Sequence, residues 1–475
     1  MKTLVRCVLG CALGVLLLAI TFLALWLNPV ESTSRGIVFA SGEAWDVQSV
    51  AVANETGEFR FFFDFEEDGF VLDDIPPYLV DLDVFVAFME NCANLWALYA
   101  IPFDEVDVEA AGLSPPSAWV RIEFFDGHVI DLQIGGREEI SNHYYARVNH
   151  SSNVYVVSQA LVEQFLMPKT QVVTRMVTPP LALSSPLSAI HDIRFTGEGV
   201  EREIEILSVR GGSQEVSLAA LSFGAPTHLV QGAATYQLDQ SVGVEIFDSL
   251  FGIEGDIVAY HLSDDEMAAF GFEKPYMVIE YNMTNGVDVD ERQMRLKVAK
   301  ADDGLFYITR DELCAVFLME PLPFINIQFE QLPLRWFLNP LLMDLQAVTI
   351  RSPDRETRFE IDTTDVRNPV ITYDGQELEV DLFHAFFRLI TSAAHDGTYL
   401  GVLPPPLGEA ALEIIYEYSV AGKEPDILSL YPGVERRVNV YINGAGEFAM
   451  RDLFVQRVLE GSENLIHGRA IEENW

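Results

Sequence analysis

Val47-Gln-Ser-Val50-Ala-Val52 is the stretch that decides the fold, because its pattern occurs two more times in the chain. Apolar residues hold the same three positions in Ile190-His-Asp-Ile193-Arg-Phe195 and in Leu345-Gln-Ala-Val348-Thr-Ile350. Each stretch has the length and apolar spacing of a short strand. A repeat on this scale indicates that one structural unit recurs along the chain. The sequence therefore predicts a module that is present in three copies.

The same order of elements follows each of these stretches. A second strand, a helix and a third strand come next, and a strand, a turn, a strand and a helix close the copy. The second strands are 59–65, 202–207 and 357–361, the helix openings 80–85, 242–247 and 378–383, the third strands 118–124, 277–281 and 412–416, and the closing segments 145–166, 296–318 and 438–459. The second copy is longer before its helix, which predicts an insertion around residues 225–240. Ser158 and Thr309 are the predicted N-caps of the closing helices, whereas Arg451 in the third copy requires a different cap.

Strand patterns outnumber helix patterns, and they lie on both sides of the first helix of each copy. This order favours an α+β fold with largely antiparallel sheets over a doubly wound parallel sheet. Stretches rich in proline and serine lie between the copies. Such residues end helices and strands, so we predict that these stretches are linkers. They are 178–186 and 320–323, followed by Pro333 and Pro340. The predicted domains are a cytoplasmic tip with a transmembrane anchor at 1–30 and modules at 40–180, 187–330 and 339–465.

The uncharged apolar run at residues 7–27 predicts a transmembrane helix. A helix rises about 1.5 Å per residue, so this run is long enough to cross the roughly 30 Å hydrocarbon core. Lys2 and Arg6 precede the run, so the positive-inside rule leaves the N-terminus in the cytoplasm and the bulk of the chain outside. A cleaved signal peptide has a shorter apolar core and a small-residue cleavage site, which the exit Ala24-Leu-Trp-Leu-Asn28 lacks. Cys11 resembles a lipobox cysteine, but most of the run follows it, so an uncleaved anchor is the prediction.

The chain is strongly acidic, with 72 Asp and Glu against 30 Lys and Arg and a formal net charge of −42. Such a surface repels nucleic acid and anionic headgroups, so we expect no nucleic-acid partner. Of the four cysteines, only Cys92 and Cys314 lie outside the predicted anchor, and both stand in apolar helical patterns. We expect two buried free thiols rather than a disulfide framework, which suits a bacterial cell surface.

The sequence holds no signature of catalysis. It contains no Walker A loop, no G-x-S-x-G elbow, no H-E-x-x-H pair and no C-x-x-C pair. The acidic clusters at 66–69, 73–74, 264–266 and 288–291 lack the alternating spacing of a calcium loop, so we predict solvated faces. We therefore predict no catalytic residue, no cofactor-binding residue, no metal ligand and no cofactor.

The histidines and tryptophans leave alternatives that the structure can test. His143 and His150 are predicted surface side chains on opposite faces of a strand, and His384 and His395 stand about three helical turns apart. Several tryptophans could line a sugar-binding face, but they fall in apolar patterns, so we predict that they pack in the core. These tryptophans are Trp45, Trp96, Trp119 and Trp336.

The first copy also resembles a known family. The stretches that carry the likeness are Ala111-Gly112-Leu113-Ser-Pro115, Asp126-Gly127, Leu132-Gln-Ile134-Gly135, Tyr144-Tyr145-Ala-Arg-Val148 and Val154-Tyr-Val-Val157. Over residues 40–180 they resemble the bacterial domain of unknown function family 4340. The second copy keeps Gly271-Phe272 and Pro275 without an Ile-Gly step, and the third copy is less similar. The resemblance implies a membrane-anchored, surface-exposed bacterial protein. Because members of this family are often encoded beside ABC transporters of the gliding-motility type, it also implies an accessory extracytoplasmic subunit.

Two functional hypotheses follow from these observations. The first is a non-catalytic extracytoplasmic accessory or scaffold subunit of a bacterial membrane complex, with an ABC transporter as the expected complex and its permease and ATPase as the expected partners. The alternative is a cell-envelope polysaccharide-binding protein or hydrolase that uses acidic and aromatic residues. Repeated modules place similar surfaces in a row, which suits extended contact with a partner.

Overall fold

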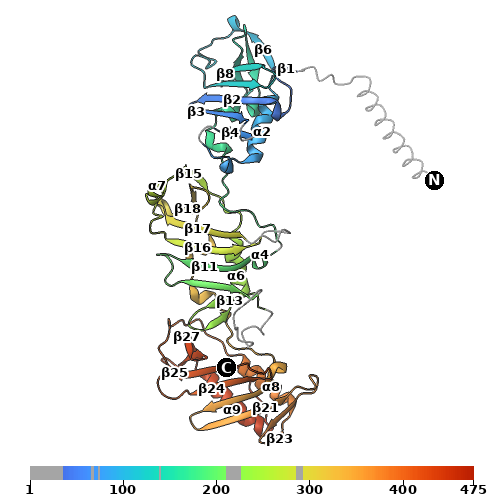
Figure 1. Cartoon of the computed structure of the whole chain (residues 1–475), viewed down its shortest axis with the longest axis vertical. Coiled ribbons are helices and arrows are strands. Elements are labelled where there is room, and N and C mark those ends of the chain that lie inside the picture. The colour runs from blue at the N-terminus through green and yellow to red at the C-terminus, as the bar shows by residue number, and fades with distance from the viewer. Residues whose placement is uncertain are drawn as a thin grey trace, which may run out of the picture. The chain divides into compact units, whose positions relative to one another are not determined.

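The computed structural model describes residues 36–65, 69–72, 75–138, 141–183, 185–209, 226–284 and 292–475 (Figure 1). The chain separates into two compact units, of which unit 1 ends at Thr174 and unit 2 comprises Arg175–Trp475. Each unit combines antiparallel sheets with helices. The prediction of a mixed α+β fold with largely antiparallel sheets is therefore confirmed.

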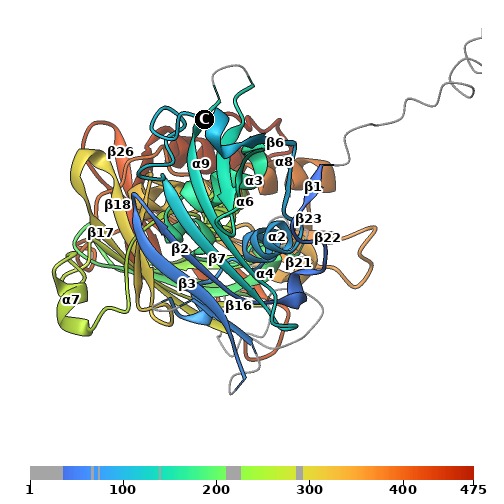
Figure 2. The same cartoon turned by 90° about the horizontal axis from the view of Figure 1, so that it is seen from above.

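Unit 1 is built on one antiparallel sheet, here called sheet 1, with the strand order β4-β3-β2-β7-β8-β9-β10-β6. Its strands are β2 (Val47–Asn54), β3 (Gly57–Asp64), β4 (Gly69–Leu72), β6 (Tyr99–Pro102), β7 (Ala118–Phe124), β8 (Val129–Arg137), β9 (Tyr144–Val148) and β10 (Asn153–Val157). Two short strands, β1 (Ile37–Val38) and β5 (Trp96–Ala97), pair beside it. Helices α2 (Leu82–Ala93) and α3 (Gln159–Leu166) pack against one face, as Figure 2 shows for α2.

Alternation along the strands explains why sheet 1 has one covered and one open face. In β7, Ala118, Val120 and Ile122 are buried, whereas Trp119 and Arg121 between them are exposed. Successive side chains of a strand point to opposite faces, so the buried set faces the helices and the exposed set faces solvent. The open face is charged, because the Arg121 guanidinium pairs there with Glu123 at 2.9 Å and Asp131 at 3.0 Å.

Unit 2 contains two antiparallel sheets, here called sheets 2 and 3. Sheet 2 has the order β14-β13-β12-β11-β16-β17-β18-β19-β15, and sheet 3 has the order β23-β22-β21-β20-β24-β25-β26-β27. Sheet 2 consists of β11 (Ile190–Thr196), β12 (Ile204–Ser208), β13 (His228–Gln231), β14 (Thr235–Gln237), β15 (Asp256–Tyr260), β16 (Met277–Met283), β17 (Arg292–Lys300), β18 (Phe306–Arg310) and β19 (Ala315–Met319). Sheet 3 consists of β20 (Leu345–Ser352), β21 (Arg355–Asp362), β22 (Val370–Tyr373), β23 (Gln376–Glu377), β24 (Leu412–Tyr418), β25 (Asp426–Pro432), β26 (Arg437–Ile442) and β27 (Ala445–Arg451).

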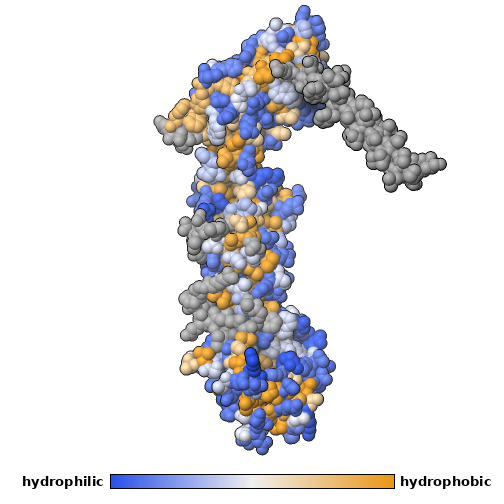
Figure 3. All heavy atoms as spheres, turned by 90° about the vertical axis from the view of Figure 1, so that its right-hand side faces the viewer, coloured by the Kyte–Doolittle hydropathy of each residue, from blue (hydrophilic) through white to orange (hydrophobic). Residues whose placement is uncertain are grey.

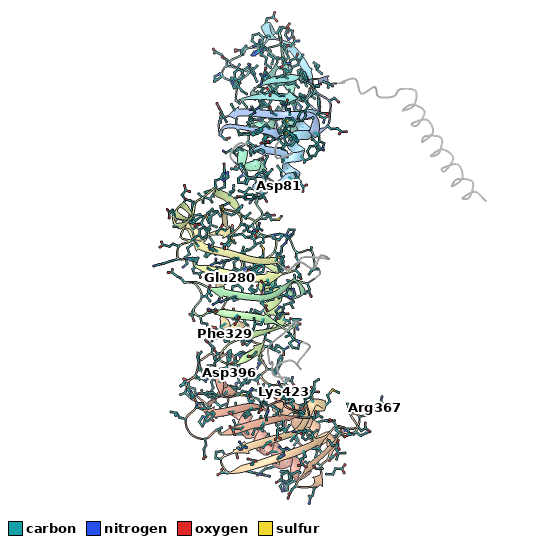
Figure 4. All side chains as sticks on the ribbon, in the orientation of Figure 1. Asp81, Glu280, Phe329, Arg367, Asp396 and Lys423 are labelled. Carbon is teal, nitrogen blue, oxygen red and sulfur yellow. The ribbon has the colours of Figure 1, made fainter. Side chains whose placement is uncertain are left out.

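Helices cover one side of each of these sheets as well. They are α4 (Pro186–Ala189) and α6 (Gln240–Asp248) on sheet 2, and α8 (Val380–Thr391) and α9 (Leu453–Ile466) on sheet 3, with α7 (Asp264–Ala268) in the connection between β15 and β16. The open face of sheet 2 carries Glu280, labelled in Figure 4, whose carboxylate pairs with Arg295 at 3.1 Å. Sheet 3 carries Arg351 in the same way, paired with Glu356 at 2.8 Å.

The cores under sheets 1 and 3 use the same three aromatic positions. In sheet 1, the Phe61 ring lies 5.1 Å from Phe85 and 5.0 Å from Phe88 of α2. In sheet 3, the Phe359 ring lies 6.2 Å from Phe383 and 5.5 Å from Phe386 of α8. The cross-strand partners also correspond, because Phe61 pairs with Val50, Phe359 with Val348, and Ile206 of sheet 2 with Ile193. In sheets 1 and 3, the phenylalanine on the strand next to the first strand of the copy thus packs beneath the first helix.

The structure corrects the expected end of the second copy. Residues 296–298 belong to β17, which pairs with the third strand β16, and Thr309 lies within β18 instead of capping a helix. The strand β19 follows where a closing helix was predicted, because Ala315-Val-Phe-Leu-Met319 completes the sheet by pairing with β18 and β15. Ser158 is the N-cap residue of α3 but accepts no hydrogen bond through its side chain, and Asp452 holds that position in α9.

The expected insertion also lies elsewhere. Residues 226–240 contain β13 and β14, which continue sheet 2 beyond β12. The extra length is the segment 209–227 between β12 and β13, whereas only residues 65–68 separate β3 from β4. Periodicity missed this because both short strands carry mixed polar and apolar residues.

Cys314 and the tryptophans overturn two predictions about burial. Cys92 is buried in α2 as expected, but Cys314 is exposed in the turn between β18 and β19, where its φ is 43°. The tryptophans are exposed instead of packed in the core. Their exposed fractions are 61% for Trp45, 37% for Trp96, 49% for Trp119 and 39% for Trp336. An apolar neighbourhood in sequence does not bury a side chain that stands at an outward position of a strand or in a connection.

Within the described ranges, no helix is both long and apolar enough to cross a membrane. The predicted anchor at 7–27 lies outside those ranges, as do the acidic residues at 66–68, 73–74 and 288–291.

Candidate functional site

The linker between sheets 2 and 3, residues 320–344, is held by backbone hydrogen bonds on both sides. On the side of sheet 2, Leu334 N donates to Gln237 O at 2.6 Å and Asp239 N donates to Leu332 O at 2.8 Å. Toward sheet 3, Phe337 N donates to the Ala393 carbonyl at 2.9 Å. The prolines that were predicted to break secondary structure thus lie in a segment that joins the edge strand β14 to the following sheet.

The hydrogen bonds continue from the segment after α8 to the edge strand β27. His395 N donates to Arg335 O at 3.1 Å, Ala449 N donates to Thr398 O at 3.0 Å, and Leu400 N donates to Glu447 O at 2.7 Å. Backbone groups are strong hydrogen-bonding partners, so these bonds link β14 to β27 through the linker and the segment after α8. They position side chains from both sheets around one buried carboxylate.

Glu447 is that carboxylate, and its side chain is fully buried in β27. The Arg202 guanidinium, which precedes β12, forms an ion pair with Glu447 Oε1 and also donates to the Tyr399 hydroxyl at 2.9 Å. The guanidinium carbon lies 3.9 Å from the centre of the Phe329 ring, in a cation–π contact. A buried carboxylate is strongly destabilising unless it is paired, so Arg202 is the residue that makes this position tolerable. We call Glu447, Arg202, Tyr399 and Phe329 the Glu447 site.

Aromatic rings surround the buried carboxylate of the Glu447 site. The Phe448 ring lies 5.4 Å from Tyr236 and 5.5 Å from Tyr399, and Phe329 lies 5.6 Å from Tyr399. Burial raises the pKa of Tyr236, and the neighbouring Glu447 carboxylate raises it further. Tyr236 therefore stays a neutral phenol at physiological pH, so it lines the site as a polar side chain and does not act as a base.

Gly232 completes the enclosure because the carboxylate approaches its backbone closely. A Cβ atom at this position would lie 2.4 Å from Glu447 Oε2 and 2.7 Å from Phe329 Cζ. Neither distance is possible for real atoms, so a larger residue would displace the carboxylate or the ring. The site thus depends on a glycine in the connection between β13 and β14.

Two hollows lie beside the Glu447 site. The first has a volume of about 760 Å³, and the second has a volume of about 380 Å³. The indoles of Trp336 and Trp475 and the imidazole of His395 line the larger hollow, and Arg202 and Tyr399 line the smaller one. Figure 4 labels Phe329 and Asp396, which border these hollows from the linker and from the segment after α8.

His395 is buried at the wall of the larger hollow, stacked 4.6 Å from the Phe448 ring. Burial lowers the pKa of His395, and the charge of Arg335 lowers it further. The Pro333 carbonyl and the Asp396 carboxylate raise this pKa but do not reverse the shift. Burial by itself would raise the pKa of the adjacent Asp396, but hydrogen bonds from Thr398 and Arg437 lower it overall. At neutral pH the hollow therefore presents a neutral imidazole beside an ionised carboxylate.

A further concave surface of about 730 Å³ lies on the open face of sheet 1. Trp119, Arg60 and Arg121 line it, together with His150 from the turn after β9. It differs from the Glu447 site because its ion pairs are exposed to solvent.

The geometry of the Glu447 site favours structure and binding over chemistry. Its carboxylate is held by a guanidinium and enclosed by rings, so it is not free to attack a substrate or to take a proton from it. Among the described residues, no group of three or more His, Cys, Asp or Glu side chains could hold a metal ion. His384 and His395 do not meet in such a group.

The sequence patterns assigned no functional role to any residue of the Glu447 site. One signal was present, because Glu447 directly precedes the apolar residues Phe448-Ala-Met450 in a strand that is buried along nearly its whole length. Its partner Arg202 lies 245 residues away in the sequence, so no local pattern could pair the two.

Comparisons with protein-family models, with curated proteins and with solved structures found no match to this chain. The resemblance to the bacterial domain of unknown function family 4340 therefore stays a prediction.

Proposed function

We propose that this chain is a non-catalytic extracytoplasmic accessory or scaffold subunit of a bacterial membrane complex. In this proposal an anchor at 1–30 holds three copies of one α+β module, at 40–180, 187–330 and 339–465, outside the membrane. The common strand order of sheets 1, 2 and 3 supports the repeat. The family resemblance supports an ABC transporter of the gliding-motility type as the complex, with its permease and ATPase as partners.

The observation that carries the proposal is the connection between sheets 2 and 3. A scaffold must hold its binding surfaces at a fixed spacing, and a linker paired on both sides suits that task. The buried Glu447 carboxylate is neutralised by its ion pair with Arg202. Both features supply rigidity, and neither supplies a nucleophile or a general base.

Affinity purification of the full-length protein from gently solubilised membranes tests the proposal. We expect a permease and an ATPase to be recovered in stoichiometric amounts with the wild-type chain. Recovery of the chain without any membrane protein would contradict the proposed role.

A cell-envelope polysaccharide-binding protein or hydrolase is the second candidate, and the exposed tryptophans favour it. Trp336 and Trp475 line the larger hollow beside Arg335 and Asp396, and planar rings beside charged groups suit the apolar face and the hydroxyls of a sugar. Titration of the full-length protein with purified cell-wall glycan fragments tests it. Binding that the substitution Trp336→Ala abolishes and Trp96→Ala leaves unchanged would favour this candidate, and release of new reducing ends would identify a hydrolase.

A further inference from the structure

Unit 1 exposes a set of packed aromatic side chains at the end of sheet 1, here called the aromatic cluster. Its members are Trp45, Phe63, Phe65, Phe70 and Phe125. The Phe63 ring is central, because it lies 5.2 Å from Phe65, 5.3 Å from Phe70 and 5.7 Å from Phe125. Trp45 extends the cluster at 6.0 Å from Phe70. In Figure 3, apolar side chains gather at an edge of unit 1, at the top of the view.

The aromatic cluster is both exposed and rigidly supported. The exposed fraction is 72% for Phe65, 61% for Trp45 and 45% for Phe125. The cluster continues into the core, since the Phe70 ring lies 5.4 Å from the buried Phe85 of α2. Rings that are held in place before binding lose little conformational freedom when a partner covers them. Contiguous exposed aromatic surface of this kind is typical of protein–protein contact sites.

Charges around the aromatic cluster define the kind of partner. Glu43, Asp46 and Asp126 are exposed next to its members in the sequence. Along the described residues 36–65, Arg60 is the one basic side chain, and its guanidinium lies over the Phe62 ring. This rim repels anionic lipid headgroups and attracts basic side chains.

We propose that the aromatic cluster is a docking surface for a partner protein that offers an apolar groove rimmed by Lys and Arg. The inference deepens the proposed function and rests on it, because it assumes that the chain works by binding other proteins. The rings fill the groove, and the surrounding carboxylates pair with its rim. Phe65 and Phe125 are the anchors of the contact, since aromatic residues at the centre of an interface contribute most of the binding energy.

Photo-crosslinking in isolated membranes tests the proposal with the full-length protein. The photoreactive residue p-benzoylphenylalanine replaces Phe65 or Phe125, and in control proteins it replaces Leu407 or Val434, which are 95% and 75% exposed in unit 2. We expect crosslinks from positions 65 and 125 to one protein, within a peptide in which apolar residues are flanked by Lys or Arg. We also expect their yield to fall several-fold when salt rises from about 0.05 to about 0.5 M.

A matched pair of double variants measures the contribution of the rings. Phe65→Ser with Phe125→Ser should reduce recovery of the crosslinked protein in the affinity purification roughly tenfold, whereas Leu407→Ser with Val434→Ser should leave it unchanged. Thermal unfolding of both variants checks that unit 1 keeps its fold, and the isosteric pair Asp46→Asn with Asp126→Asn tests the rim in an intact fold. That pair should weaken recovery by a smaller factor and flatten its salt dependence.

The outcomes separate this inference from the proposed function. Crosslinks to lipid, to a second copy of the chain, or to nothing at positions 65 and 125 overturn the docking surface. If the membrane partners are still recovered with the serine variants, the accessory role stands and the docking surface lies elsewhere. If the wild-type chain recovers no partner, the proposed function fails and the docking surface fails with it.

Discussion

Two of the arginine–carboxylate pairs in unit 2 have the same chemistry but lie in different environments. In the Arg202–Glu447 pair the carboxylate is fully buried and the arginine side chain is 26% exposed. In the Arg351–Glu413 pair on the open face of sheet 3, the arginine is 47% exposed and the glutamate 22%. The charged groups of the exposed pair can exchange each other for water, whereas the buried carboxylate depends on Arg202 for its counter-charge. We therefore expect the Arg351–Glu413 pair to contribute little to the free energy of unfolding and the Arg202–Glu447 pair to contribute much more.

The largest effect should come from the substitution Arg202→Met, which leaves Glu447 buried without a counter-charge. We expect the free energy of local unfolding at β27 to fall by about 3–5 kcal/mol. Hydrogen exchange measured by mass spectrometry on peptides from β27 reports this quantity directly in the full chain.

The double variant Arg202→Met with Glu447→Gln is the control for this prediction. It removes the buried charge together with its partner, so it should recover a large part of the lost stability. An Arg202→Met protein with wild-type protection at β27 would show that the buried pair does not hold the two sheets together.

A smaller loss should follow the substitution Gly232→Ala. The new Cβ must displace the Glu447 carboxylate or the Phe329 ring, and overpacking of this kind costs about 1–3 kcal/mol. Gly136→Ala is the matched control, because the nearest atom to a Cβ there lies at 3.6 Å, an ordinary contact. Chemical denaturation of both variants compares them, and equal midpoints would mean that the site yields without strain.

The free energy of unfolding should depend on pH through His395, because this imidazole is buried and neutral in the folded protein. Burial lowers its pKa in the folded protein, so the unfolded chain takes up a proton at higher pH than the folded chain does. The free energy of unfolding should therefore fall as pH drops through about 6.5, by at most about 1.4 kcal/mol per pH unit, and level off below the folded-state pKa. The variant His395→Phe should lack this component between pH 7 and pH 5, and parallel curves for the two proteins would refute the assignment.

The smallest effect should come from Arg351→Met on the open face of sheet 3. Exposed pairs contribute about 0.2–1 kcal/mol, and salt screens them. Thermal unfolding at low and high salt should show a small loss that disappears as the salt concentration rises. A loss as large as that of Arg202→Met would remove the contrast between the two pairs.

The fold could be predicted to a large extent because strand periodicity is local. The three stretches that begin at Val47, Ile190 and Leu345 became the strands β2, β11 and β20 with the same starting residues. The helices that begin near Asp81 and Glu379 were visible from their repeated apolar spacing. The wrong prediction of a helix after Thr309 also has a physical cause. A short apolar run such as 315–319 can form a helix or a strand, and here its pairing with β18 decides for the strand.

The candidate site could not be predicted, because it depends on contacts between distant segments. Burial of Glu447 follows from the position of β27 at a sheet edge that pairs with the segment after α8, and Arg202 reaches the carboxylate from the side of sheet 2. The exposure of Trp119 follows from its place between two inward-facing neighbours, which a count of apolar residues does not register. Predicting which side chains are buried or exposed requires the register of the strands as well as their positions in the sequence.

The mass of the complex that contains the full-length chain tests the central claim most directly. Native mass spectrometry of the protein released from gently solubilised membranes compares this mass with the 53.2 kDa of the chain. The proposed role predicts a species heavier than the chain by the masses of identifiable membrane proteins in fixed ratio. A single species at the mass of the chain, or at a multiple of it, would contradict the claim that this protein is a subunit of a larger membrane complex.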